Sequence, residues 1–145
     1  MVGFRTPDDV VYLADCLSSR ETLDKYQIGF IYDVAAYLKT LEMVKTMKAK
    51  MFVPAHAEAA ADVSGLAQYN IDKVCQIAEK IIELCAEPIS FESLLQRLFM
   101  EYGLTMNFEQ YVLVGSTVRS YLSWLKDTEK INAMFEKNLL LWERV

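Results

Sequence analysis

The sequence predicts a mixed α/β fold that gives way to a helical region near its middle, and three observations support this. Two β-rich runs flank a turn at the N-terminus, and an amphipathic helix then leads into a short apolar strand. After Gly65 the pattern becomes helical until a final hairpin. Strand, helix and strand in this order are typical of a layered α/β unit. We therefore expect two domains, over residues 1–69 and 70–145.

The N-terminal elements follow from the β-rich runs. "VGF" and "VVYLAD" surround "RTPDD", whose proline and aspartates favour a turn, so this segment predicts a hairpin. The second run is almost continuously apolar, as in a strand buried on both faces, and we expect it to end at Asp15. "LSSRETLDKYQIGFIY" then predicts an irregular connection with a short helical turn.

The next segment predicts a helix and a strand. Asp33 is a suitable N-cap for a helix over residues 34–50, whose apolar positions repeat at intervals of three and four. "KMFV" follows as a short buried strand, which we expect Pro54 to end. His56, the single histidine of the chain, lies just beyond this strand.

The second half of the chain predicts three helices. "NIDKVCQIAEKIIELCAEP" forms the first, with Asn70 as its expected cap. Ser90 is the expected cap of the second, "FESLLQRLFMEYG", which closes at Gly103. The third follows Asn107 and covers residues 108–126. The tail alternates around "EKN" and predicts a hairpin.

Three helices followed by a β-hairpin is the order of a winged-helix unit, which commonly reads DNA with its third helix. Here the only basic side chains of that helix are Arg119 and Lys126. Residues 70–145 hold eight basic and eleven acidic side chains, a net charge of −3. We therefore expect this domain to serve packing or subunit contact and to bind no nucleic acid.

The bulk composition excludes several classes of protein. Of 145 residues, 53% are hydrophobic, and the net charge is −5, so the chain supports a core and has no charge excess for phosphate. Neither a membrane-spanning run nor a signal peptide is visible, so we expect no membrane association and a cytoplasmic location. The three cysteines include no CxxC pair, and we expect Cys75 and Cys85 to be buried apolar residues.

Asp15 and His56 are the candidate functional residues, because each follows a predicted strand, where layered sheets place functional groups. An imidazole and a carboxylate together suit zinc or iron. A single aspartate after a strand is more often a turn residue, however, and a lone histidine more often has a structural role. Their positions alone leave both interpretations open.

The segments around these two residues resemble a known family. "VGFRTPDDVVYLADCLSSRETLDKY", an amphipathic helix and then "MFVPAHAEA" are similar to the C-terminal half of the metallo-β-lactamase superfamily. Members carry a hairpin ending in an aspartate, a helix, and a strand ending in "PgHg". The resemblance covers roughly residues 1–70, and several branches add a helical extension. It implies the C-terminal half of an αββα sandwich followed by a winged-helix-like domain.

The resemblance also implies an activity. Asp15 matches the carboxylate that bridges two divalent metal ions, and His56 matches the last histidine ligand. Zinc is the expected metal, with iron or manganese as alternatives, and the substrate of the parent protein would be a small molecule. The implied reaction is hydrolysis of an ester, thioester, amide or phosphodiester by metal-activated water.

The departures from the family pattern limit what this chain can do. The HxHxDH cluster is absent from the sequence, and Ala57 stands where glycine usually follows the histidine. Because a catalytic site needs at least three protein ligands, we expect a fragment of a larger enzyme that is inactive and metal-free by itself. We also expect homo-oligomerisation to cover an exposed apolar sheet face. The alternative is a non-catalytic, winged-helix-like oligomerisation or interaction module.

Overall fold

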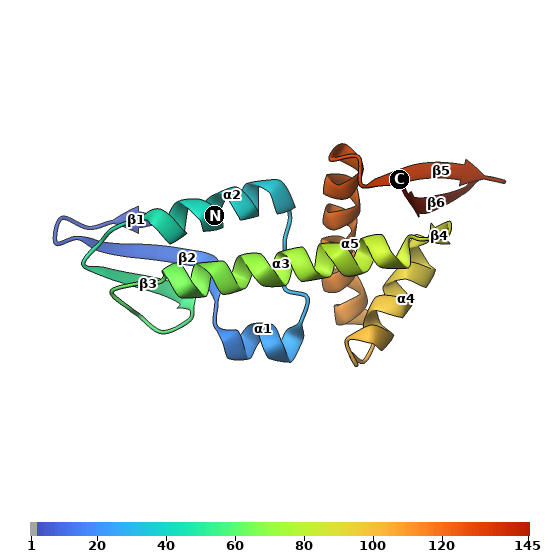
Figure 1. The fold of residues 1–145 in the computed structure, drawn as a ribbon. Coiled ribbons are helices and arrows are strands. Elements are labelled where there is room, and N and C mark those ends of the chain that lie inside the picture. Colours follow the sequence, from blue (N-terminus) through green and yellow to red (C-terminus); the bar gives the residue numbers. More distant parts are fainter. Residues whose placement is uncertain (1–2) are drawn as a thin grey trace. The chain divides into compact units, whose positions relative to one another are not determined.

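A computed structural model of the chain describes residues 3–145, and Figure 1 labels its elements in chain order. Val2 of the predicted first strand lies outside the described residues. Over the described part of the chain, no helix is both long and apolar enough to cross a membrane. The elements are β1 (Phe4–Arg5), β2 (Val10–Ser18), α1 (Arg20–Tyr26), α2 (Val34–Thr46), β3 (Met51–His56), α3 (Ser64–Leu84), β4 (Ile89–Ser90), α4 (Phe91–Glu101), α5 (Phe108–Asp127), β5 (Ile131–Glu136) and β6 (Leu139–Arg144).

The chain divides into two compact units. The first holds the described residues up to Gln27 together with Ala35–Val74, and the second holds Ile28–Val34 and Cys75–Val145. Helix α3 contributes residues to both. The segment Ile28–Val34 belongs to the second unit through hydrogen bonds to α5, including one from the Ser120 hydroxyl to the Tyr32 carbonyl. The predicted domain boundary between residues 69 and 70 stays a prediction.

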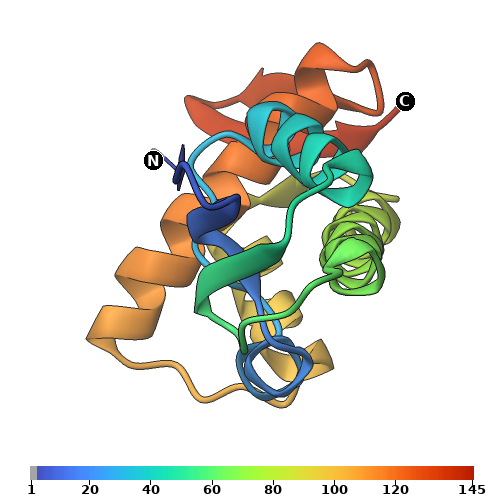
Figure 2. The ribbon, with the colours of Figure 1, turned by 90° about the vertical axis from the view of Figure 1, so that its left-hand side faces the viewer.

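The first unit is built on a three-stranded sheet in the order β1-β2-β3. β1 and β2 pair antiparallel as the predicted hairpin, while β2 and β3 pair parallel, with α2 in the connection between them. Helices α2 and α3 lie to the same side of these strands (Figure 2). The core between them is formed by Val11, Leu13, Cys16, Leu17, Leu41, Val44, Phe52, Val63, Ala67 and Ile71.

The opposite face of this sheet is open and apolar. Tyr12 pairs with Phe4 in the hairpin, and their rings stack with centroids 4.6 Å apart. Phe4 is 60% exposed, Tyr12 39% and Met51 37%. Parallel strands are usually covered on both faces. The first unit therefore presents a sheet with one buried and one exposed apolar face.

Strand β2 does not end at Asp15, so that prediction is wrong. It continues to Ser18, which pairs with His56, while Ala14 pairs with Pro54. Between these two pairings β2 advances four residues and β3 only two, so β2 bulges, and Ala14 adopts φ 49°. Asp15 lies inside this bulge. Bulges re-aim side chains, and here the bulge exposes the carboxylate.

The prediction that Pro54 ends the next strand is also wrong, because β3 runs from Met51 to His56. Proline has no N–H to donate and is tolerated where a strand lies at the edge of its sheet. β3 is such an edge strand. The strand therefore passes through Pro54 and ends on the histidine.

Helix α3 begins at Ser64, earlier than predicted, and Asn70 is not its cap. The Asp62 carboxylate accepts the Ser64 N–H at 2.9 Å, which satisfies one of the free amides at the start of the helix. Asn70 instead lies inside the helix, where it is 1% exposed.

The predicted helix ends of the second unit are confirmed. The Ser90 hydroxyl accepts the Ser93 N–H at the start of α4, and the Asn107 side chain accepts the Gln110 N–H at the start of α5. Gly103 follows α4 with φ 62°, a left-handed conformation that glycine adopts at little cost. The helices enclose a core of buried side chains that includes Ile81, Leu94, Leu98, Val118, Tyr121 and Leu125.

The predicted C-terminal hairpin is also confirmed. Lys137 and Asn138 form a two-residue connection between β5 and β6, and both have positive φ, as the mirror-image turns of tight hairpins require. β4 adds a third strand, giving the order β4-β6-β5.

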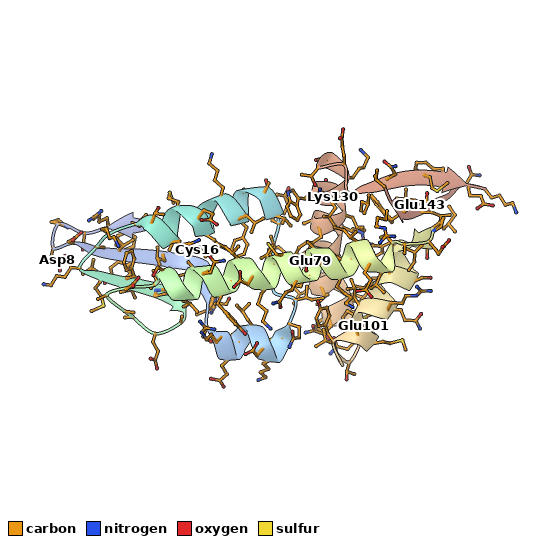
Figure 3. All side chains as sticks on the ribbon, in the orientation of Figure 1. Asp8, Cys16, Glu79, Glu101, Lys130 and Glu143 are labelled. Carbon is orange, nitrogen blue, oxygen red and sulfur yellow. The ribbon has the colours of Figure 1, made fainter. Side chains whose placement is uncertain are left out.

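The cysteines occupy two kinds of environment. Cys16 and Cys85 are buried, and Figure 3 labels Cys16 on β2, among the side chains beside α2 and α3. Burial raises the pKa of each of these two thiols from 9.0 to about 11. Cys75 is exposed, so the prediction that it is a buried apolar residue is wrong.

We predict opposite stability effects for two alanine-to-glycine substitutions in the sheet. Ala14→Gly should raise the free energy of unfolding by about 0.5–1 kcal/mol, because the left-handed strain at Ala14 exceeds the extra chain entropy of glycine. Ala55→Gly, at a position of β3 whose φ is not in the left-handed region, should lower it by about 0.5–1 kcal/mol. Urea denaturation measures both, and an effect of the same sign at the two positions would contradict the bulge.

We predict that an aromatic disulfide reagent at pH 8 labels Cys75 rapidly and the other two thiols only after unfolding. A pKa of about 11 leaves Cys16 and Cys85 with roughly a hundredth of the thiolate of an ordinary thiol, and burial blocks access as well. The Cys75→Ser variant should lose the fast phase.

Because unfolded thiols ionise near pH 9, the free energy of unfolding should fall between pH 9 and 11.

Candidate metal site

The structure brings the two candidate ligands together. The Nε2 atom of His56 lies 3.3 Å from the Oδ1 atom of Asp15. The His56 side chain is 58% exposed and the Asp15 side chain 64%, so both are open to solvent and to a ligand. The residues are separated by α1 and α2 in the chain and meet only through the parallel pairing of their strands.

Backbone contacts hold His56 at the end of β3. It pairs with Ser18 in the parallel register, and its carbonyl accepts the Ser19 N–H at 2.8 Å. Ser19 also caps α1, since its hydroxyl accepts the Thr22 N–H at 3.1 Å. Asp15 reaches the same place from the bulge of β2. Residues 15–19 therefore carry the carboxylate, pair with His56 and provide the cap of α1.

The geometry of the pair fits two ligands of one metal ion. Nitrogen and oxygen donors bound at about 2.1 Å in a tetrahedral arrangement lie roughly 3.4 Å apart, close to the observed separation of Nε2 and Oδ1. Imidazole and carboxylate are also donor types that zinc and iron accept. Within residues 3–145, no group of three or more His, Cys, Asp or Glu side chains is placed to hold a metal ion. The described residues thus bring two potential ligands together and place no third His, Cys, Asp or Glu with them.

A second polar cluster attaches α1 to α3 within the first unit. The Asp24 carboxylate accepts a hydrogen bond from the Tyr69 hydroxyl and lies 2.8 Å from the Lys73 ammonium group. The Lys73 ammonium and the Tyr69 hydroxyl together lower the pKa of the Asp24 carboxyl. The Arg20 guanidinium stacks on the Tyr69 ring, 4.1 Å from its centroid. This cluster fixes the helix that follows the candidate site.

The sequence analysis missed the contact between α3 and β2. Asn70 bonds to the backbone of Ser18, three residues after Asp15. A signal for this contact exists in the sequence, because Asn70 lies four and seven residues before Val74 and Ile77 and shares their apolar helix face. A polar residue in such a stripe must find partners inside the protein.

Comparisons by sequence identify no relative, since no family model and no curated protein matches the chain. The fold, in contrast, is similar to solved structures. A beta-lactamase domain protein from Burkholderia ambifaria matches with a TM-score of 0.77 and 14% identity, over 99% of this chain and 44% of that chain. A metallo-beta-lactamase family protein from Thermus thermophilus matches with a TM-score of 0.72 and 15% identity, over the same shares.

These matches confirm the resemblance at the level of fold. Both cover almost the whole of this chain, and this chain spans less than half of either structure. At 14% and 15% identity they carry no information on substrate or activity. The chain has the fold of a portion of a metallo-β-lactamase-family protein.

Proposed function

We propose that this chain is part of a metal-dependent hydrolase in which Asp15 and His56 are metal ligands. The observation that carries the proposal is the 3.3 Å separation of their Oδ1 and Nε2 atoms. The fold shared with metallo-β-lactamase-family structures supports it. The two donors come from different strands, and this is how the fold would assemble a site that the linear sequence does not contain.

The proposed chemistry divides between the metal and the protein. When bound, two divalent ions, zinc or alternatively iron or manganese, would supply an activated water and polarise an ester, thioester, amide or phosphodiester of a small substrate. Asp15 and His56 would be this chain's ligands to these ions. Asp15 has two carboxylate oxygens with which to bridge, and His56 presents Nε2 on the same side. Two ligands do not complete such a site, so we propose that the others belong to a longer protein.

We predict that the protein encoded by the complete reading frame binds two metal ions and loses them when either ligand is changed. Asp15→Asn and His56→Asn should each lower metal content, measured by mass spectrometry, and reduce kcat/KM for the best substrate of an ester, thioester, amide and phosphodiester panel by at least roughly 100-fold. Asp72→Asn, at an exposed position of α3, is the control and should change neither.

The isolated 145-residue chain tests the proposed division of the site between this chain and the rest of a longer protein. It should show no hydrolysis and no stoichiometric metal by itself. A metal ion held tightly by the isolated chain would contradict the division of the site, and full activity in both ligand variants of the complete protein would contradict the assignment of Asp15 and His56.

For the second unit we propose a winged-helix-like domain that contacts protein rather than nucleic acid. The order α4, α5, β5, β6, with β4 completing the sheet, supports the first part of this proposal. Helix α5 supports the second, because its N-terminal half exposes Phe108, Val112 and Leu113, which are 77%, 49% and 50% accessible. Exposed apolar side chains in a group are typical of protein contacts.

We further propose that the chain self-associates through the open face of the first sheet. Phe4, Tyr12 and Met51 are exposed there on a mixed sheet, and strands paired in parallel, as β2 and β3 are, are usually covered on both faces. A second copy placing the same face against it would bury these side chains, as a symmetric dimer contact does.

We predict that light scattering after gel filtration finds the chain as a dimer at micromolar concentration, and that Tyr12→Lys makes it monomeric. Leu113→Lys, an equally severe change on α5, tests the alternative and should leave the dimer intact. Tyr32→Lys is the control at an exposed loop position. A monomeric wild type, or a dimer lost only in Leu113→Lys, would contradict association through the sheet.

A further inference from the structure

Asn70 pairs with the strand that carries Asp15 as if it were a piece of neighbouring strand. Its Oδ1 atom accepts the Ser18 N–H at 3.1 Å, and its Nδ2 atom donates to the Ser18 carbonyl at 3.0 Å. The two backbone groups of one residue are thus bound by one side-chain amide. Ser18 and Asn70 are 52 positions apart, so this contact joins α3 to the end of β2.

The amide stands where the sheet has no strand. Among the described residues, β1 pairs with Tyr12 and Val11 of β2 and does not reach the bulge. At Ser18, the side of β2 that faces away from β3 therefore has no strand partner among the described residues. Backbone N–H and C=O groups in such a place need a partner, and Asn70 provides a donor and an acceptor at once.

Every hydrogen-bonding position of the Asn70 amide is used. Besides the two bonds to Ser18, Nδ2 donates to the Leu66 carbonyl at 2.9 Å and Oδ1 accepts from the Tyr37 hydroxyl at 3.3 Å. Burial raises the pKa of Tyr37 to about 12, so this hydroxyl keeps its proton and remains a donor. A primary amide has two donors and two acceptor positions, and all four are satisfied here.

Ser18 connects this amide to the candidate ligands. It pairs with His56 across the β2–β3 ladder, and the next residue, Ser19, donates its N–H to the His56 carbonyl at 2.8 Å. On its other side lies the bulge that carries Asp15. Fixing Ser18 from α3 therefore fixes both the end of the bulge and the residue opposite the histidine.

We infer that Asn70 is a positioning residue that holds Asp15 and His56 at ligand distance. It contacts neither of them and acts through Ser18 and Ser19. Its consequence for metal binding rests on the proposed function, whereas its effect on the geometry of the pair does not. Asn70 is 1% exposed on an apolar helix face, and the positioning role accounts for a polar residue at that position.

The test compares Asn70 variants with a variant of equal burial that lacks the contact. Asn70→Asp keeps the size of the side chain but loses both donors, so a carboxylate faces the Ser18 and Leu66 carbonyls. Asn70→Ala removes all four bonds. Val74→Ala, one turn further along α3 at a position that is 3% exposed, destabilises the same helix without touching Ser18.

Amide hydrogen exchange by NMR, in the 145-residue chain at one fixed pH, gives the structural readout. In Asn70→Ala the Ser18 and Ser19 amides should exchange at least roughly tenfold faster than in the wild type, relative to the Phe52 amide, which bonds to Ala60. In Asn70→Asp the carboxylate can still accept the Ser18 N–H, so there the faster exchange is expected at Ser19. The ring signals of His56, the single histidine, should broaden or shift. In Val74→Ala the ratio to Phe52 and the ring signals should stay unchanged. Equal behaviour of the Asn70 variants and Val74→Ala would overturn the inference.

Metal retention in the complete protein separates this inference from the proposed function. Asn70→Asp should weaken metal binding by roughly 10–100-fold, as losses of outer-shell partners do, while Val74→Ala should leave it unchanged. Faster exchange with unchanged metal affinity would overturn the positioning role. Unchanged metal content in Asp15→Asn and His56→Asn would instead refute the proposed function, and the exchange and ring signals would still decide whether Asn70 holds the pair.

Discussion

The parallel pairing of β2 with β3 is the constraint on which the candidate site depends. β2 has nine residues and β3 six, yet their first residues, Val10 and Met51, pair with each other and so do their last, Ser18 and His56. The longer strand can meet this register only by bulging, and the bulge turns the Asp15 carboxylate toward the imidazole. The left-handed conformation of Ala14 costs roughly 1–2 kcal/mol, and the pairing beyond the bulge must offset this cost.

Burial of apolar side chains on one face of the sheet contributes much of the free energy that offsets the strain at Ala14. Leu17, Leu41 and Phe52 are fully buried between the strands and helices α2 and α3, and burying one such side chain contributes about 1.5–3 kcal/mol. The opposite face carries stacked Phe4 and Tyr12 rings in contact with solvent. The same sheet therefore combines a buried core face with an exposed apolar face.

The site is exposed and its support is buried, and this division has a physical reason. Asp15 and His56 lie at the surface, and the proposed metal-ligand role requires this because an ion and a substrate must reach them. Side chains there have little packing to hold them in place. Asn70 holds them from the interior, and leaving its partners unsatisfied would cost about 1–3 kcal/mol for each buried polar group. The proposed metal binding by Asp15 and His56 thus depends on the stability of α3, which carries Asn70.

The sequence by itself determined the elements whose signals are local. The caps at Ser90 and Asn107, the left-handed Gly103 and the tight turn at Lys137 were predictable because each depends on residues within three or four positions. The two candidate ligands were also found in the sequence, through their resemblance to a family motif.

Only the tertiary structure decided where β2 and β3 end, where α3 begins and what Asn70 does. These features depend on partners far along the chain, since Ser18 meets both His56 and Asn70, and hydrogen bonds between distant residues override local preferences for a turn, a proline stop or a helix cap. The distance between Asp15 and His56 belongs to the same class, because the register of two strands sets it and neither strand alone contains it.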